Sequence, residues 1–188
     1  NYQVTSGLEA YGQAWFTKGR VISQIAPSAS FFNTYALPIS NPFLQPLVRN
    51  EICAGFGIAQ PDCDAAAATS DASDPAYREV LLGLRRRFVE WGPRTSTFEN
   101  EAFQVAAGLR GDLPADWNWD LGAQYGESGQ VSTVNRFGLF SRLQQSLRAV
   151  DSSTCVDTSN SCVPVNLFAP VGSMTQDMFD YLEAASST

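Results

Sequence analysis

Apolar and polar side chains alternate with a period of two in two neighbouring segments, residues 100–110 and 117–127. The apolar positions are Phe103, Val105, Ala107, Leu109, Trp117, Trp119, Leu121, Ala123 and Tyr125. The polar positions between them include Gln104, Arg110, Asn118, Asp120 and Gln124. Because successive side chains of a β-strand point to opposite faces, this alternation predicts two strands, each with one apolar and one polar face.

The two predicted strands are separated by residues 111–116, which contain Gly, Asp and Pro and are typical of a turn. We therefore expect an antiparallel hairpin with the odd-numbered apolar residues of both strands on one common face. Phe103 to Leu109, with one residue added at each end, spans roughly 25 Å at about 3.3 Å per residue.

Two environments fit this apolar face. A length of this order suits tilted strands that cross the apolar band of an outer-membrane barrel, and Trp and Tyr at strand ends favour the boundary between lipid and water. A hairpin of a soluble β-sandwich, with its apolar face on a core, fits the alternation equally well.

Composition restricts the possible functions of the chain. It has 188 residues, a net charge of −7 and a mean hydropathy of −0.13. No apolar run approaches the length of a membrane-spanning helix, which excludes a helical membrane protein. The acidic balance argues against nucleic-acid binding, which needs clustered cations. The sequence contains no histidine, which removes Ser-His-Asp and Cys-His catalysis and His-ligated metal sites. We expect no enzymatic activity, no cofactor and no metal.

The four cysteines form two close pairs, Cys53 with Cys63 and Cys155 with Cys162. An even number of cysteines in close pairs within loop-like sequence predicts two disulfides and an oxidising compartment. Both disulfides are expected in loops on the same side of the sheet. A zinc site built from all four cysteines is the alternative, but such sites prefer spacings of two to four residues, which neither pair has.

The rest of the chain has weaker patterns. Residues 8–17 alternate well enough to predict a further strand, although Tyr11 and Trp15 lie on its polar side. The hairpin's second strand is expected to continue through 130–134. Two segments, about 19–78 and 135–188, are expected to be long loops, which are uncommon unless they have a function.

Short helices are expected within these segments. Residues 74–91 fit both periods, and we expect a helix that ends near Gly83 followed by a strand to Trp91. Leu143, Leu147 and Val150 indicate one or two helical turns. A capping box that begins at Ser173 predicts a C-terminal helix.

Seven segments together carry a family resemblance. They are residues 36–43 (ALPISNPF), 86–94 (RRFVEWGPR), 108–113 (GLRGDL), 117–120 (WNWD), 141–147 (SRLQQSL), 162–168 (CVPVNLF) and 172–175 (GSMT). In their order and spacing they resemble the TonB-dependent receptors of the bacterial outer membrane, in the style of the large paralogous sets of sphingomonads. Such receptors import scarce ligands with energy delivered by an inner-membrane complex.

The resemblance implies an all-β fold: an antiparallel transmembrane β-barrel of about 22 strands with a plug domain inside. The chain would be a segment of the barrel wall, with four or five strands and two long external loops. Its apolar residues would face lipid, namely Phe103, Val105, Ala107, Leu109, Trp117, Trp119, Leu121 and Tyr125. Its polar residues would face the lumen, namely Gln104, Arg110, Asn118, Asp120 and Gln124.

The chain departs from the family in length. It has no TonB box, no plug-like segment and no aromatic-terminated final strand, so we expect it to be a piece of a larger receptor. The expected partners are the lipid bilayer, the remaining barrel strands, the plug domain, and the TonB complex through a missing N-terminal region. The transported ligand is left open among siderophore, saccharide and cobalamin.

Two soluble functions compete with the receptor. A secreted glycosidase would use two carboxylates among Asp116, Asp120 and Glu127, but Asp120 and Glu127 point to opposite faces of one extended strand. A carbohydrate-binding β-sandwich would use Trp117 and Trp119 as a stacking platform. It accounts for the aromatic residues and the disulfides, but not for two long, two-faced strands.

Overall fold

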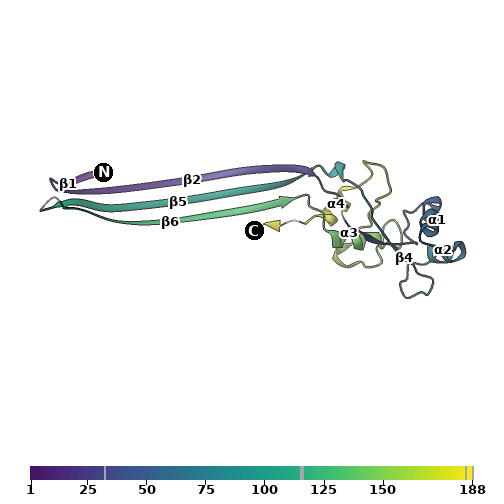
Figure 1. The fold of residues 1–188 in the computed structure, drawn as a ribbon. Coiled ribbons are helices and arrows are strands. Elements are labelled where there is room, and N and C mark those ends of the chain that lie inside the picture. The colour runs from purple at the N-terminus through teal and green to yellow at the C-terminus, as the bar shows by residue number, and fades with distance from the viewer. Residues whose placement is uncertain (32, 115–116, 185, 188) are drawn as a thin grey trace. The chain divides into compact units, whose positions relative to one another are not determined.

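The computed structural model describes residues 1–31, 33–114, 117–184 and 186–187. The chain divides into two compact units, each of which is described by itself (Figure 1). Unit 1 comprises Asn1–Ser23, Ser96–Thr133 and Ser187–Thr188. Unit 2 comprises Gln24–Thr95 and Val134–Ser186.

Unit 1 is built on long antiparallel strands. Its sheet has the order β1-β2-β5-β6-β7, so its strands are neighbours in the order in which they follow along the chain. The strands are β1 (Tyr2–Thr5), β2 (Leu8–Pro27), β5 (Pro93–Leu113), β6 (Trp117–Asn135) and β7 (Ser186–Ser187). The predicted hairpin of 100–110 with 117–127 is confirmed as β5 and β6. The strand predicted at 8–17 and the continuation through 130–134 are confirmed as well.

Short and long connections alternate between these strands. Two residues join β1 to β2, and residues 114–116 join β5 to β6. The long connections are residues 28–92 between β2 and β5, and residues 136–185 between β6 and β7. The backbone N–H of Asp112 donates to the carbonyl oxygen of Gly7 at 3.2 Å, so both short turns lie at the same end of the sheet.

The described residues form an open sheet and no closed barrel. β1 pairs only with the beginning of β2, from Tyr2 opposite Ala10 to Thr5 opposite Leu8. The rest of that edge of β2 has no neighbouring strand in the part of the chain that the structure describes. The expectation of a mostly β, antiparallel fold is therefore confirmed, and the expected barrel appears only as an open sheet.

Unit 2 contains α-helices and a two-stranded sheet. In this sheet β3 (Tyr35–Pro38) pairs antiparallel with β4 (Glu79–Leu82). Its helices are α1 (Pro46–Gly55), α2 (Gln60–Ala67), α3 (Phe140–Leu147) and α4 (Gln176–Leu182), with 3-10 turns at Val89–Trp91 and Ser159–Ser161. Within the described residues, none of the helices has both the length and the apolar character needed to cross a membrane.

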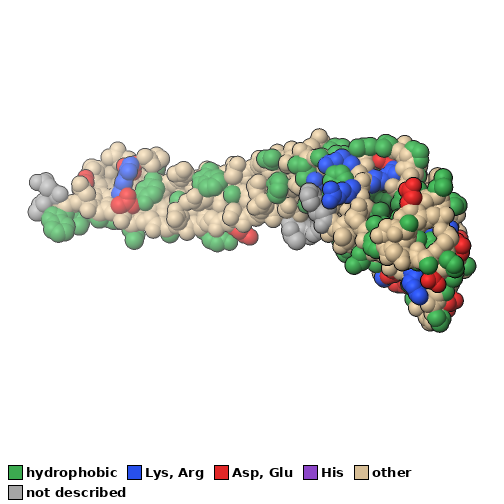
Figure 2. All heavy atoms as spheres, turned by 45° about the vertical axis from the view of Figure 1, so that its right-hand side comes forward, with side chains coloured by type: hydrophobic (Ala, Val, Ile, Leu, Met, Phe, Trp, Pro, Cys, Tyr) green, Lys and Arg blue, Asp and Glu red, His purple; other side chains and the backbone are tan. Residues whose placement is uncertain are grey.

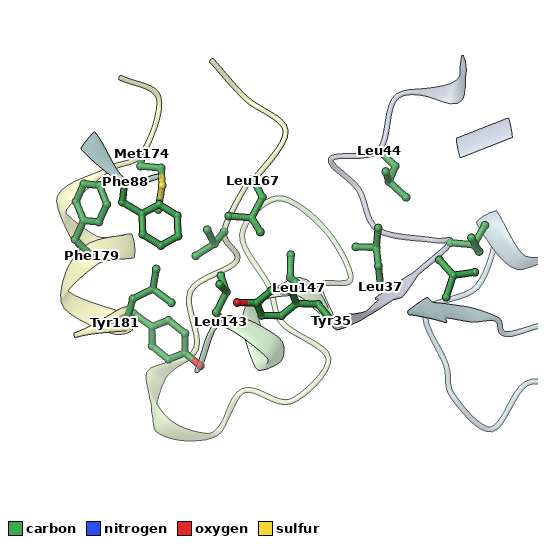
Figure 3. Close-up of a cluster of buried hydrophobic side chains, with 14 of the residues drawn as sticks. Tyr35, Leu37, Leu44, Phe88, Leu143, Leu147, Leu167, Met174, Phe179 and Tyr181 are labelled. Carbon is green, nitrogen blue, oxygen red and sulfur yellow. The ribbon is translucent and has the colours of Figure 1, made fainter. Parts of the chain in front are cut away.

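The core of unit 2 joins segments that are far apart in the sequence (Figure 3). Its buried residues include Tyr35, Leu37, Phe88, Trp91, Leu143, Leu147, Leu167, Met174, Phe179, Tyr181 and Leu182. The ring of Trp91 stacks on that of Phe179, with 5.0 Å between centroids. The two long connections of the sheet therefore fold together around one hydrophobic core.

Both predicted disulfides are confirmed, Cys53–Cys63 and Cys155–Cys162. The expected placement in loops holds only for the second, which pins the segment around the 3-10 turn at Ser159–Ser161. Cys53 lies in α1 and Cys63 in α2, so the first disulfide ties two helices together.

The helical turns predicted around Leu143 and the predicted C-terminal helix are confirmed as α3 and α4. Long segments connect the strands as expected, but β2 continues to Pro27, so they span residues 28–92 and 136–185 and contain the elements of unit 2. Two further details of the predictions were wrong. The helix expected to end near Gly83 is absent from the described residues; a turn leads into β4 there, because pairing with β3 outweighs local helical spacing. The cap of α4 is Thr175 and not Ser173: the Thr175 hydroxyl accepts from the N–H of Met178.

Candidate functional site

The two faces of the sheet in unit 1 are the candidate functional surface. We call the face that carries Gln104, Arg110 and Asp120 the polar face, and the opposite one the apolar face. Each strand contributes to both faces because it alternates with a period of two.

The polar face is cross-linked by side-chain hydrogen bonds over three strands. Arg110 donates to both carboxylate oxygens of Glu9, at 2.8 and 3.1 Å. Tyr11 donates its hydroxyl to Asp120 at 2.6 Å and so reaches from β2 to β6. Polar groups that hydrogen-bond to one another in this way need few hydrogen bonds from water.

The amide of Gln104 continues this network. It accepts from the indole N–H of Trp15 at 2.8 Å and donates to the amide oxygen of Gln124 at 2.8 Å. The polar positions of Tyr11 and Trp15, which blurred the alternation of residues 8–17, are therefore explained: each ring places its polar atom against a partner on a neighbouring strand.

The apolar face is exposed within the chain itself, and hydrophobic side chains are visible along the strands in Figure 2. Trp117 is 71% exposed, Leu121 70% and Tyr125 61%. The rings of Phe103 and Tyr125 lie 5.8 Å apart across β5 and β6. Phe16 on β2, Val105 and Leu109 are exposed as well. Exposed apolar surface of this extent indicates a partner or an apolar medium.

A row of ion pairs crosses the apolar face, and exposed apolar residues such as Ile22 and Val131 follow beyond it. Lys18 pairs with Glu101, and Arg20 lies 3.3 Å from Glu99. Lys18 follows Phe16 by two positions and Glu101 precedes Phe103 by two, so these charges lie on the same face as the apolar residues. We call the residues between the turns and this row the apolar band.

Two glycines make room for the Tyr11 side chain on the polar face. A Cβ at Gly108 would lie 2.4 Å from Cζ of Tyr11 and 2.7 Å from the carbonyl oxygen of Leu121. A Cβ at Gly122 would lie 2.5 Å from the Tyr11 hydroxyl oxygen. Tyr11 can therefore reach Asp120 only because glycine occupies both positions beneath it.

The Gly108→Ala substitution should lower the free energy of unfolding of the sheet by about 1–3 kcal/mol, because it overpacks the space under Tyr11. Gly129→Ala is the matched control, since a Cβ there would meet no atom within 4 Å. Urea unfolding of both variants checks this expectation. Equal losses in the two variants would show that Tyr11 does not depend on the space above Gly108.

A polar cleft of about 740 Å³ lies in unit 1 beside the two short turns. It is lined by residues of β1, β2, β5 and β6, among them Gln3, Glu9, Arg110, Asn118 and Asp120. The structure thus brings together three of the residues predicted to face the lumen: Arg110, Asn118 and Asp120. Gln104 and Gln124 lie on the same face, in the network with Trp15.

The arrangement gives no support to carboxylate catalysis. Asp120 is bonded to Tyr11, and Glu127 follows it by seven positions on the same strand, which places Glu127 on the apolar face. Asp116, the third candidate, lies outside the described residues. Across the described ranges, no cluster of three or more Cys, Asp or Glu could hold a metal ion.

The sequence pattern missed two features of this surface. The first is that Glu9, Tyr11 and Trp15 bond to polar residues of β5 and β6. The sequence signal was that all three occupy odd-numbered positions of one strand and therefore share its polar face. The second is the row of ion pairs. Its sequence signal was a positive charge at Lys18 on β2 and a negative charge at Glu101 on β5, each two positions from the nearest apolar residue of the same face.

Comparisons of the chain with protein-family models, with curated proteins and with solved structures find no match.

Proposed function

We propose that the sheet of unit 1 is part of the wall of a TonB-dependent receptor in the bacterial outer membrane, and that the receptor imports a scarce ligand. The observation that carries the proposal is the contrast between the two faces. The apolar face is exposed and is crossed by a row of ion pairs, whereas the polar face is cross-linked by hydrogen bonds. In this proposal, lipid covers the first face and the lumen lies at the second.

The length of the apolar band supports a membrane crossing. A tilted strand crosses a bilayer in about 9–11 residues. On β2, the band runs from Leu8 to Phe16, where Lys18 begins the charged row. The remaining part of this 20-residue strand would extend beyond the hydrocarbon region.

The connections support the same orientation. Outer-membrane barrels have short turns on the periplasmic side and long loops on the outer side. Here the two short turns share one end of the sheet, and the two long connections follow the other ends of β2 and β6. The proposal therefore assigns the short turns to the periplasm and unit 2 to the external medium, where its two disulfides are chemically stable.

The open edge of β2 supports further strands as partners. Unpaired backbone groups in hydrocarbon cost several kcal/mol each, so a barrel wall has to be closed by neighbouring strands. The proposed partners are the remaining barrel strands, a plug domain against the polar face, and the TonB complex. The assignment to this receptor family rests on the resemblance of the seven sequence segments. No catalytic role is proposed for any residue.

A nitroxide scan of both faces tests the lipid contact. Single cysteines for labelling are introduced on the apolar face by Val105→Cys, Leu109→Cys and Leu121→Cys. The polar-face set is Gln104→Cys, Asn118→Cys and Gln124→Cys. In membranes of bacteria that make the protein, electron paramagnetic resonance measures contact of each label with oxygen and with a water-soluble nickel complex.

The expected result is a period of two, with high oxygen contact for the apolar-face labels and low oxygen contact for the polar-face labels. High nickel contact for the apolar-face labels would overturn the proposal. Immobile labels on that face, reached by neither reagent, would also overturn it, because they would indicate a protein core such as that of a soluble β-sandwich.

A further inference from the structure

Unit 2 contains a cleft of about 440 Å³ that is lined by residues of unit 2 alone. Its lining includes Tyr77, Glu79, Ser141, Gln145, Arg148 and Asp157. These residues come from the start of β4 and the turn before it, from α3 and its C-cap Arg148, and from the segment closed by the Cys155–Cys162 disulfide. The volume is within the range of about 300–1,000 Å³ that is typical of small-molecule sites.

A fixed ion pair forms one wall of the cleft. Arg148 donates to both carboxylate oxygens of Glu79, at 2.7 and 2.9 Å, and Tyr77 donates its hydroxyl to Glu79 at 2.5 Å. Burial opposes the charge on Glu79, but the hydrogen bonds from Arg148 and Tyr77 outweigh it and hold the pKa of Glu79 below its ordinary value. Glu79 therefore stays ionised and occupies one side of the guanidinium group.

Gln145 holds another part of the lining in place. Its amide donates to the carbonyl oxygens of Asp157 and Ser159, both at 2.9 Å, and accepts from the Tyr181 hydroxyl at 2.9 Å. Asp157 accepts from the N–H of Ser159 through one carboxylate oxygen, which lowers the pKa of Asp157. A carboxylate can accept about four hydrogen bonds, so Asp157 keeps acceptor capacity for a ligand besides its bonds to Ser159.

The polar groups of the cleft suit hydroxyl groups. Nε and one Nη of Arg148 bind Glu79, and the other Nη carries two N–H donors with no hydrogen-bond partner in the described part of the chain. Asp157 supplies an acceptor, and the hydroxyl of Ser141 can both donate and accept. A ligand hydroxyl also donates and accepts, so it can bridge such neighbours.

The polar groups and the charge balance favour a neutral ligand. Glu79 and Asp157 together outweigh Arg148, which disfavours an anion. An ammonium group offers no acceptor to the free N–H donors of Arg148, whereas a hydroxyl group does. Apolar surface is supplied by Ala72 and Val156 and by the ring of Tyr77. We infer that this cleft binds a neutral saccharide through its ring hydroxyls. The role of that saccharide as the imported ligand rests on the proposed function, whereas its binding to unit 2 does not.

Isothermal titration calorimetry on the whole protein in detergent tests the inference. The neutral probes are glucose, maltose, cellobiose and lactose, and the charged probes that match glucose are glucuronate and glucosamine. The expected result is binding of at least one neutral sugar, tighter than that of either charged probe. Asp157→Asn and Arg148→Lys should each weaken it by about tenfold or more, because each removes a hydrogen bond to a charged group.

Asp151→Asn is the matched control. Asp151 accepts from the N–H of Ser153 just as Asp157 accepts from Ser159, but it does not line the cleft. Affinity should be unchanged in this variant. The inference is overturned if no neutral sugar binds, if a charged probe binds more tightly, or if affinity survives both Asp157→Asn and Arg148→Lys. The nitroxide scan is independent of sugar binding, so failure of the receptor proposal and failure of the cleft can be distinguished.

Discussion

The Glu90→Gln variant is expected to lose about 3 kcal/mol of the free energy of unfolding of unit 2, because it leaves a buried arginine without its counter-ion. The side chains of Arg86 and Glu90 are only 10% and 11% exposed, and an Nη of Arg86 lies 2.6 Å from the Glu90 carboxylate. Hydrogen exchange of the backbone amides around Trp91 and in α4, measured on the whole protein, reports this loss.

The same pair fixes the segment that precedes α4. Arg86 also donates to the carbonyl oxygens of Ala169 and Pro170, and Glu90 accepts from the N–H of Gly172. Glu51→Gln is the control, because Glu51 is exposed on α1 and should change stability by less than about 0.5 kcal/mol. Similar exchange rates in the two variants would contradict a stabilising role for the pair.

The pH dependence of unit 2 follows from the same carboxylate. Burial acts to raise the pKa of Glu90, but hydrogen bonds and the charge of Arg86 outweigh it, and the net result is a lowered pKa. The contribution of Glu90 to stability is therefore complete above its ordinary pKa and is lost as the pH falls through its lowered value. Glu90→Gln should remove this part of the acid sensitivity.

Strands β2, β5 and β6 of unit 1 were predictable because each of them encodes its own two faces, whereas the short β1 and β7 were not predicted. The alternation from Phe103 to Leu109 and from Trp117 to Tyr125 requires no information from elsewhere in the chain. The ends of the strands were not predictable in this way. Beyond Phe103, Glu101 and Glu99 replace apolar residues on the same face, and the strand continues there because Lys18 and Arg20 on β2 pair with them.

The disulfides and two helices of unit 2 were predicted, but its tertiary contacts could not be, because they are not local. The Gln144 side chain on α3 accepts from the N–H of Ala36 and donates to its carbonyl oxygen, so it borders β3 as a neighbouring strand would. Tyr35 packs on Phe140, with 5.1 Å between ring centroids. No period within residues 28–92 or 136–185 signals such pairs. Local signals for α1 and α2 did exist, namely Pro46 and Pro61 in their first turns.

The cleft of unit 2 was missed for the same reason. Strands β5 and β6 lie between Glu79 and Arg148 in the sequence, and neither residue belongs to a recognisable motif. The disulfide Cys155–Cys162 was the one local signal, because it identified a segment whose position is restricted. The sequence therefore indicated where a rigid surface segment lies, but not which residues it faces.

The Leu121→Arg variant is expected to lose about 2–4 kcal/mol of stability in a bilayer, which is the cost of arginine near the midplane on the lipid face of a barrel. Leu121 lies within the apolar band and is 70% exposed, so its replacement removes little packing inside the chain. In water, the same substitution would be close to neutral. Urea unfolding of the membrane-bound protein measures the difference from wild type.

Two controls separate face and depth. Gln124→Arg places the same charge on the polar face, where water or polar groups can solvate it, and should cost at most about 1 kcal/mol. Val131→Arg lies on the same face as Leu121 but beyond the row of Lys18 and Glu101, and a cost of about 0–1 kcal/mol is expected there, as near a membrane interface. Only lipid contact confined to the apolar band produces a large loss at Leu121 together with small losses at both controls. If Leu121→Arg leaves stability unchanged, this face lies in water. Equal losses of stability for Leu121→Arg and Val131→Arg would show that the ion pairs do not mark the boundary of the membrane.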